Sequence, residues 1–452
     1  MISPRTSIFP GLGRTLCVLA FALLAACGER ERSGIPPRHL LLITGEGIRA
    51  DHVTHLGYAR QTTRVIKPDQ QTVLDIDHLG VTGVTFARAY APSGEVPTSV
   101  ASLVTGAAPY QHGLILPGGR IAQGMPTLAE DFRREGFVSA AFLSSKTLGR
   151  EGGFTRGFDK ELYAGSDEGA LQAAVEWLRQ EVPKGERHFT WIHLSGATLP
   201  FAGEPMDDPV STVAYEGPVR DELPFFGALA RGEVELGPAD RARLRDLYDG
   251  RLLRFTKIIN AFFFCYKYTF DDGALWDDSV IAFAGVSGCE LAERDGTVGS
   301  SHSLVDAGLH VPIILRHINS MTGERILGEV VELTDVAPTM RSWFGLETHD
   351  ELTGRDLLSL TDTNAPRPFE SRPALAFRFE DGDVTGHSVR DARWRLTSDR
   401  GAPRLFDVDV DPGHRMDVSE AFPLVLPALE EALRNRLELL GSAGPLSTRG
   451  DQ

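Results

Sequence analysis

The sequence predicts an α/β protein, a three-layer αβα sandwich with a mostly parallel central sheet, followed by a small C-terminal α+β subdomain. Two observations support this prediction. From residue 39 to about residue 345, short uninterrupted apolar runs alternate with segments of helical period, and buried parallel strands joined by helices have this pattern. Beyond residue 345, short strand-like segments follow one another before one last helical segment, which is typical of an antiparallel sheet with a helix on it.

The first 27 residues are expected to be a targeting segment rather than part of the fold. Arg5 and Arg14 supply positive charge, and the apolar run at 16–26 is too short to favour a spanning helix. The run ends in LAAC, which resembles a bacterial lipobox, so we expect lipidation at Cys27. The mature chain would then be anchored by lipid in the bacterial cell envelope, with the outer membrane or periplasmic face favoured. An ordinary signal peptide with an incidental cysteine is the alternative.

Composition bounds the remaining partners. The chain of 452 residues is 42% apolar and carries a formal net charge of −16, which argues against binding to nucleic acid through charge. The partner that we predict is a membrane, reached through the lipid at Cys27. The sequence does not identify a protein partner or an anionic-ester ligand. Cys17 would leave with the signal; Cys265 and Cys289 either pair or remain buried thiols.

The first predicted strand, at residues 39–44 (HLLLIT), follows a polar tether at 28–37. Glu46 and Gly47 lie at its carboxyl end, where open α/β sheets bind ligands. A strand-like segment at 81–90 then leads into the stretch 91–113 (APSGEVPTSVASLVTGAAPYQHG). That stretch is typical of a loop that enters a helix capped by Thr98 or Ser99, and a helix N-terminus is a suitable seat for an anionic ester.

The later elements follow from the same patterns. Further helices are predicted at 125–135, 167–180, 241–264 and 424–440, and further strands at 138–144, 188–194, 279–284, 311–315, 374–379, 393–397 and 404–407. Residues 200–238 are rich in Pro, Gly and acidic side chains and are expected to form a surface excursion. The resulting division is a signal at 1–27, the tether at 28–37, the α/β domain at 38–345, the C-terminal subdomain at 346–440 and a tail at 441–452.

The order of these segments resembles the sulfatase family of the alkaline-phosphatase superfamily, over about residues 39–440. The resemblance rests on LLITGEGIRADH (41–52), SVASLVTGAAPYQHG (99–113), FTWIHLSGATLPF (189–201), VIAFAGVSGCEL (280–291), SSHSLVDAGLHVPIILR (300–316), VVELTDVAPTM (330–340) and RLFDVDVDPGHRMDV (404–418). It implies the family's fold, and a site built for sulfate or phosphate esters. Such a site needs a nucleophile, cations on the ester oxygens and an acid for the leaving group.

The resemblance also assigns positions to that site. The family holds a divalent metal with side chains at two strand ends, and those positions fall on Glu46, Gly47, Val286 and Ser287. The nucleophile, a formylglycine made from Cys or Ser, or a Thr or Ser in relatives, falls on Val96.

A slip of one residue would place Glu95 at the nucleophile instead. The catalytic His of the third segment falls on Thr198, and the Asp that precedes it falls on Gly196. The Lys or His that contacts the ester falls on Ser300, next to His302. Neither Val nor Glu can become formylglycine, so the nucleophile is missing in either register.

Among the metal positions, Glu46 alone could coordinate, whereas a hard divalent ion wants about six oxygens. We therefore expect no cofactor and a pseudoenzyme that acts by binding or scaffolding. The alternative is an active sulfuric-ester or phosphoric-ester hydrolase or transferase with a rebuilt site, using Thr98 or Ser99 with His302 and a divalent cation such as calcium at Glu46. A purely structural envelope lipoprotein is the third hypothesis. A concave pocket at residues 46, 96, 198 and 287 would favour binding, and a filled one would favour a structural role.

Other polar residues are interpreted as structural. His193 lies inside an apolar strand and is predicted to be a core histidine with satisfied hydrogen bonds, and His112 is predicted to support the turn after the signature helix. Arg49 and Asp51 are expected to form an ion pair in the scaffold.

Overall fold

The computed structural model describes residues 37–67, 72–116, 118–201, 215–270, 273–293, 296–300, 302–321, 323–361, 369, 371–399 and 402–442. Cys27, the predicted signal and nearly all of the predicted tether lie outside these residues, as does the predicted tail from residue 443. Within the described ranges, no helix combines the length and the apolar character needed to cross a membrane.

An eight-stranded sheet in the order β10-β2-β9-β6-β1-β5-β3-β4 forms the centre of the fold. Its strands are β1 (His39–Gly45), β2 (Val84–Tyr90), β3 (Val138–Leu143), β4 (Lys160–Tyr163), β5 (His188–Leu194), β6 (Ser279–Gly285), β9 (Ile313–Arg316) and β10 (Arg325–Glu332). Only β9 runs antiparallel to its neighbours, β6 and β2. The mostly parallel sheet predicted from the apolar runs is therefore confirmed.

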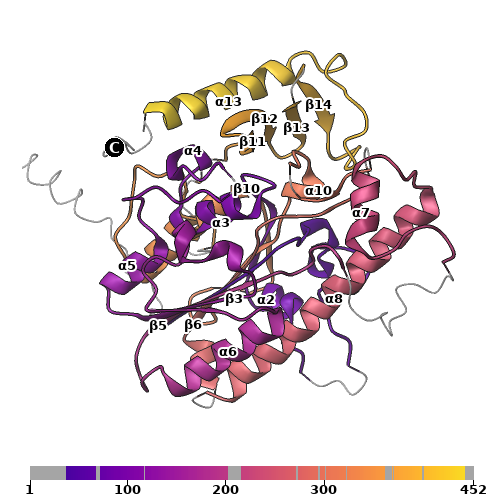
Figure 1. Cartoon of the computed structure of the whole chain (residues 1–452). Coiled ribbons are helices and arrows are strands. Elements are labelled where there is room, and N and C mark those ends of the chain that lie inside the picture. The colour runs from indigo at the N-terminus through magenta and orange to yellow at the C-terminus, as the bar shows by residue number, and fades with distance from the viewer. Residues whose placement is uncertain are drawn as a thin grey trace, which may run out of the picture. The chain divides into compact units, whose positions relative to one another are not determined.

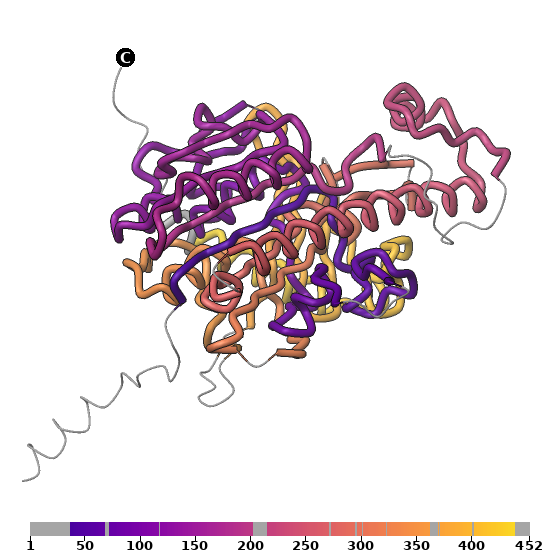
Figure 2. Tube along the Cα trace, turned by 90° about the horizontal axis from the view of Figure 1, so that it is seen from below, coloured from indigo at the N-terminus to yellow at the C-terminus, as the bar shows by residue number. Residues whose placement is uncertain are grey.

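Both faces of the sheet are buried, as the uninterrupted apolar runs require. Leu40 and Leu42 of β1 pack into one hydrophobic core, whereas Leu41 and Ile43 pack into the other. Figure 1 shows α3 (Val96–Thr105) and α5 (Leu128–Arg134) on one side of the sheet, and α6 (Asp167–Gln180) and α8 (Pro238–Tyr268) on the other. In Figure 2 the long helix α8 runs alongside β1, where the ring of Phe255 packs close to Gly45. The three-layer architecture is confirmed.

The remaining helices connect these layers or close the sheet edges. They are α2 (Ile76–Thr82), α4 (Pro109–His112), α7 (Leu223–Ala230), α9 (Ala274–Asp277), α10 (Asp306–Leu309), α11 (Val336–Phe344) and α12 (Leu358–Thr361). A short two-stranded sheet pairs β7 (Glu290–Leu291) with β8 (Val298–Gly299).

The C-terminal subdomain has the predicted antiparallel sheet. Strands β11 (Ala374–Glu380), β12 (Asp383–Arg390), β13 (Trp394–Asp399) and β14 (Arg404–Asp407) pair in sequence order, and α13 (Val425–Ser442) packs Leu429 and Leu433 against them. Buried ion pairs join this subdomain to the α/β domain. Asp306 contacts Arg390 and Arg395, and Glu332 at the end of β10 contacts Arg436 of α13.

Several sequence-based boundaries differ from the structure, and two of the differences involve short helices that were not predicted. The strand predicted at 81–90 begins at Val84, because residues 76–82 form α2, whose N-cap Asp75 accepts a hydrogen bond from the backbone N–H of His78. The surface excursion predicted at 200–238 contains α7 within its described part. In both cases the helix is short or Gly- and Pro-containing, so its periodic signal is weak.

Candidate functional site

The family positions at the ends of the central strands come together at one edge of the sheet. Strand β1 lies between β5 and β6 and is parallel to both, so all three carboxyl ends meet there. Glu46 follows β1, Thr198 lies in the turn after β5, and Ser287 follows β6. The backbone N–H of Gly47 donates to Oγ of Ser287 over 3.0 Å, which joins two of these turns directly.

A second group of family positions lies at the start of α3. A Cβ placed on Gly94 would lie 2.1 Å from the carbonyl oxygen of Ser300, so these two backbones touch. Nδ1 of His302 lies 3.9 Å from Oε1 of Glu95, and both side chains are partly exposed. His302 also has a positive φ of 65°, a conformation that side chains other than glycine adopt infrequently.

A buried series of hydrogen bonds ends at Glu46. The indole Nε1 of Trp191 donates to Oγ1 of Thr44 over 3.0 Å, and this hydroxyl lies 2.8 Å from Nδ1 of His193. Nε2 of His193 lies 3.0 Å from Oε1 of Glu46. Because a carboxylate only accepts, the His193 proton belongs on Nε2, and each bond in the series then has one donor and one acceptor. The prediction that His193 is a core histidine with satisfied hydrogen bonds is confirmed.

The position beside Glu46 is closed by the backbone of another turn. Gly47 has a positive φ of 69°, and a Cβ there would lie 2.6 Å from the carbonyl oxygen of Ala197. From the other side, a Cβ on Gly196 would lie 2.3 Å from the carbonyl oxygen of Glu46. This oxygen accepts a hydrogen bond from the backbone N–H of Ala197. Val286 and Ser287 are buried as well. The turns after β1 and β5 therefore pack directly on each other, so this corner is filled.

The donor groups present do not fit the metal of the resemblance. Glu46 contributes one carboxylate, of which one oxygen already accepts from His193, and Gly47 and Val286 contribute no side-chain ligand. Ser287 offers a hydroxyl that accepts from the N–H of Gly47. Across the described parts of the chain, no group of three or more His, Cys, Asp and Glu side chains is arranged to hold a metal ion. A hard divalent ion would find at most two side-chain oxygens here, one from Glu46 and one from Ser287, whereas it needs about six.

The hydroxyls at the start of α3 serve the backbone. The helix begins at Val96 with Glu95 as its N-cap, so the prediction that Thr98 or Ser99 caps it is wrong. Pro97 can lie in the first turn of the helix, because the N–H that proline lacks would have no partner there. The helix therefore begins before Pro97, and Thr98 and Ser99 lie inside it. The Thr98 hydroxyl donates to the carbonyl of Leu114 over 3.1 Å, and the Ser99 hydroxyl donates to the carbonyl of Ser93 over 2.7 Å.

His112 supports the same helix from behind. Its Nδ1 accepts the N–H of Leu114, and its Nε2 lies 3.0 Å from Oγ of Ser102. Burial lowers the pKa of His112 to about 3, so the ring is neutral at physiological pH. The structural role predicted for this residue is confirmed.

The cysteines of the described chain are both free thiols. Cys265 is half-buried and Cys289 is buried, so the disulfide left open by the sequence is not formed. Burial raises the pKa of the Cys289 thiol to about 12. A neutral, buried thiol is a poor nucleophile.

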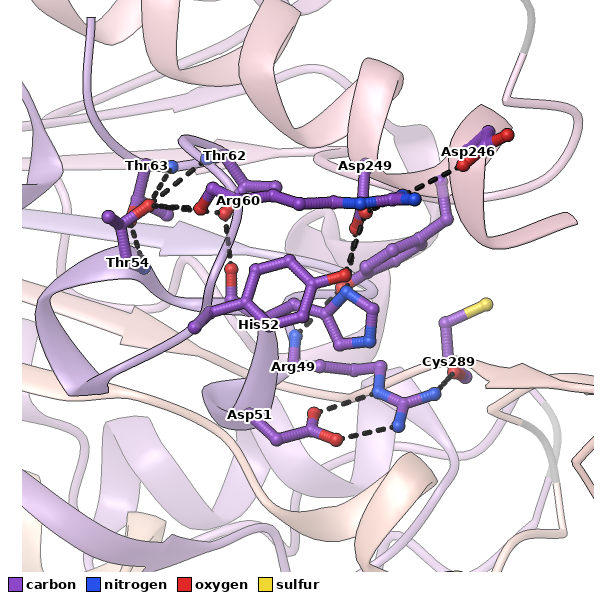
Figure 3. A network of polar contacts seen from close by, with 12 residues as sticks. Arg49, Asp51, His52, Thr54, Arg60, Thr62, Thr63, Asp246, Asp249 and Cys289 are labelled. Atoms are coloured by element: carbon purple, nitrogen blue, oxygen red, sulfur yellow. Dashed lines mark hydrogen bonds and ion pairs between the residues drawn. The ribbon is translucent and has the colours of Figure 1, made fainter. Parts of the chain in front are cut away.

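A polar network that the sequence only partly predicts lies in the segment after β1 (Figure 3). The expected ion pair is present, because Nε and Nη2 of Arg49 each donate to one oxygen of Asp51. The sequence gives no sign of the second part, in which Nδ1 of His52 lies 2.7 Å from Oδ1 of Asp249, since these residues are 197 positions apart. Asp249 also accepts from the Tyr58 hydroxyl over 2.7 Å.

Comparison with known proteins gives three results. The family profile described as Sulfatase matches residues 38–346. Arylsulfatase K of Mus musculus is 25% identical over 143 residues, which cover 29% of this chain and 26% of that protein. Arylsulfatase K of Homo sapiens is 26% identical over a stretch of the same length, with the same coverage. The aligned part thus spans about a quarter of these relatives.

Solved structures resemble the whole fold more extensively. The phosphonate monoester hydrolase of Agrobacterium radiobacter superposes with a TM-score of 0.68 and 17% identity, covering 89% of this chain and 96% of that one. A 2-O GAG sulfatase gives a TM-score of 0.68 and 18% identity, covering 90% and 93%. At these identities the superpositions establish a common fold. Since the Sulfatase profile extends over more than half of the sequence, this chain belongs to the sulfatase family.

Proposed function

We propose that this protein is a pseudoenzyme of the sulfatase family, which acts by binding or scaffolding rather than by ester hydrolysis. The observation that carries the proposal is the closed corner after β1. Glu46 is hydrogen-bonded to His193, and the backbone of Ala197 fills the space beside Gly47. A metal-dependent hydrolase needs charged ligands around its cation and a nucleophile in line with the ester. Val96, at the predicted nucleophile position, has no group that could attack the ester.

The geometry of the hydroxyl groups weighs against an active enzyme with a rebuilt site. Thr98 and Ser99 are buried, and each hydroxyl proton is used by a backbone carbonyl. Activating either oxygen would require a base in reach of that proton. His302 is instead paired at 3.9 Å with Glu95. Because the corner at Gly47 and Ser287 is filled, scaffolding is favoured over ligand binding at this edge.

The test combines metal analysis with turnover assays on the full-length protein purified from membranes. We expect substoichiometric calcium, magnesium and zinc, and no turnover of 4-nitrophenyl sulfate, 4-nitrophenyl phosphate or a phenylphosphonate monoester. An active sulfatase assayed in parallel controls for the substrates. A stoichiometric divalent ion together with metal-dependent turnover would overturn the proposal, and loss of that turnover in Thr98→Ala or Ser99→Ala would then identify the rebuilt site.

We further propose that the protein is held in the bacterial cell envelope by lipid on Cys27, with the outer membrane or periplasmic face favoured. The LAAC motif and the short apolar run before it support this proposal. In cells fed an alkyne-labelled fatty acid, the wild type should be labelled and should sediment with membranes. Cys27→Ser should lose the label, whereas Cys265→Ser should keep it. Equal labelling of wild type and Cys27→Ser would refute the anchor.

A further inference from the structure

A cavity of about 410 Å³, lined by both charged and apolar residues, lies beside the turn that follows β1, apart from the family's predicted catalytic positions. Its walls come from the segment containing Arg49 and His52, from Arg245 of α8, from Glu293, and from the loop at 412–414 of the C-terminal subdomain. Figure 2 shows the indigo segment after β1 next to the yellow C-terminal part, which agrees with their shared cavity. The cavity is large enough for a small organic molecule.

His52 presents an unused nitrogen to this cavity. Its side chain is 5% exposed, and its Nδ1 lies 2.7 Å from Oδ1 of Asp249, so the proton belongs on Nδ1. Asp249 is itself held by Tyr58 and by Arg60. Within the described residues, Nε2 of His52 has no hydrogen-bond partner, and in this tautomer it is an acceptor. Figure 3 shows the imidazole between Asp249 and Arg49.

The fixed charges around the cavity have a negative excess. The guanidinium of Arg49 is shared by two carboxylates, Asp51 and Glu293, and both line the cavity. Arg60 is likewise shared by two carboxylates, those of Asp246 and Asp249. Arg49 and Arg60 are therefore each overcompensated by acid groups, whereas Arg245, the third arginine of the wall, is not.

The acid groups of the wall are ionised. Partial burial favours the neutral acid, but the adjacent Arg49 outweighs it and lowers the pKa of both Asp51 and Glu293. The exposed Arg245 at the rim forms no ion pair within the described ranges. Apart from Arg245 at the rim, the carboxylates of Asp51 and Glu293 and Nε2 of His52 thus offer acceptors to the cavity, and such acceptors favour ligands that bring donors and positive charge.

We propose that this cavity binds a small organic cation, a primary ammonium that also carries hydroxyl groups. The ammonium would lie against Asp51 and Glu293, and a hydroxyl would donate to Nε2 of His52. The cavity contains none of the family's catalytic positions, so this binding is independent of whether the strand ends are catalytic. Metal-dependent turnover would refute the pseudoenzyme proposal and leave this one intact.

A pair of probes of nearly equal shape tests the charge requirement. Serinol (2-amino-1,3-propanediol) and glycerol differ in the ammonium or hydroxyl on the central carbon. In ligand-detected NMR titrations of the full chain at low ionic strength, serinol should bind about tenfold more tightly than glycerol, because hydrogen bonds to charged groups are the stronger ones. Equal affinity of the two probes, or no binding of serinol, would overturn the proposal.

Two variants that should change serinol affinity in opposite directions distinguish an effect on binding from a loss of stability. Asp51→Asn should weaken serinol binding about tenfold, whereas Arg245→Gln should strengthen it about threefold by removing a repelling charge. Arg254→Gln, on the same helix and outside the cavity lining, is the matched control and should change nothing. A general loss of structure cannot raise affinity, so an unchanged or weakened serinol affinity in Arg245→Gln would refute the assignment.

Discussion

Nε2 of His193 lies 3.0 Å from Oε1 of Glu46, although the two residues are 147 positions apart in the sequence. The contact joins the last strand residues of β5 to the turn after β1. It places an N–H donor on Glu46, the one carboxylate among the metal positions that the resemblance predicts. A donor in that place uses a carboxylate lone pair that a cation would need.

The hydrogen-bond series behind Glu46 should contribute measurably to stability. His193→Phe keeps a ring of similar shape but leaves the Thr44 hydroxyl without its acceptor and the Glu46 carboxylate without the N–H of His193. We expect the free energy of unfolding to fall by about 1–3 kcal/mol, the usual cost of unsatisfied buried polar groups. Urea denaturation followed by circular dichroism measures this loss.

A double-mutant cycle tests whether the series acts as a unit. Both Thr44→Val and His193→Phe remove the hydrogen bond between Thr44 and His193, so the double variant should lose less stability than the sum of the two single variants. Strict additivity of the two losses would contradict the hydrogen-bond series.

The closed corner at Gly47 predicts that the family's ligand cannot be restored by one substitution. In Gly47→Asp the new Cβ would meet the carbonyl of Ala197 at 2.6 Å, at a φ of +69°. Gly232→Asp is a matched control, since Gly232 has a φ of +73° and nothing within 4 Å of a new Cβ. The control should lose about 1 kcal/mol from backbone strain alone.

Gly47→Asp should lose clearly more stability than Gly232→Asp, and it should bind no calcium in equilibrium dialysis. The lower melting temperature of the Gly47 variant would report the backbone clash. If both variants melted together, or if Gly47→Asp gained a stoichiometric calcium ion, the corner would have to be open.

Docking of the C-terminal helix should depend on acid pH. Burial alone would raise the pKa of Glu332, but Arg436, Arg372 and Arg355 outweigh it and lower the pKa from 4.5 to about 2. A group whose pKa is lowered by folding stabilises the fold above its unfolded pKa. That stabilisation is therefore full above pH 4.5 and is lost as the pH falls towards 2.

The variant Glu332→Gln should cost about 3 kcal/mol at neutral pH, because it leaves buried arginines uncompensated, and it should flatten the acid limb of the stability profile. Glu347→Gln, an exposed glutamate, serves as the control and should keep the wild-type profile. Denaturation at a series of pH values gives the comparison. A wild-type profile for Glu332→Gln below pH 4.5 would exclude this residue as the cause.

The two thiols should differ in reactivity. With a pKa near 12, Cys289 carries almost no thiolate at pH 8, and its side chain is buried. In native protein treated with N-ethylmaleimide, peptide mass spectrometry should find Cys265 modified first and Cys289 modified only after unfolding in denaturant. Modification of native Cys289 at the rate of Cys265 would show that the segment after β6 opens readily.

The sequence alone determined the layers and many of their elements. The helix at 167–180 and the strand at 188–194 have the predicted bounds, because each has a strong periodic apolar pattern. The same local information, together with the family resemblance, leads to the prediction that Val96 and Gly47 stand at replaced family positions. The strand β2 was predicted to begin at residue 81, whereas residues 76–82 form α2, because a helix of seven residues gives little periodic signal.

What the tertiary structure decided is how the retained polar groups are used. No local pattern connects His193 to Glu46, Ala197 to Gly47, or Asp249 to His52, because strand order and register bring these partners together across long separations. Apolar periodicity records which face of an element is buried and contains no information about which distant side chain faces it. The sequence therefore led to the prediction that the catalytic groups are replaced, and the packing of the turns determined what surrounds the predicted positions.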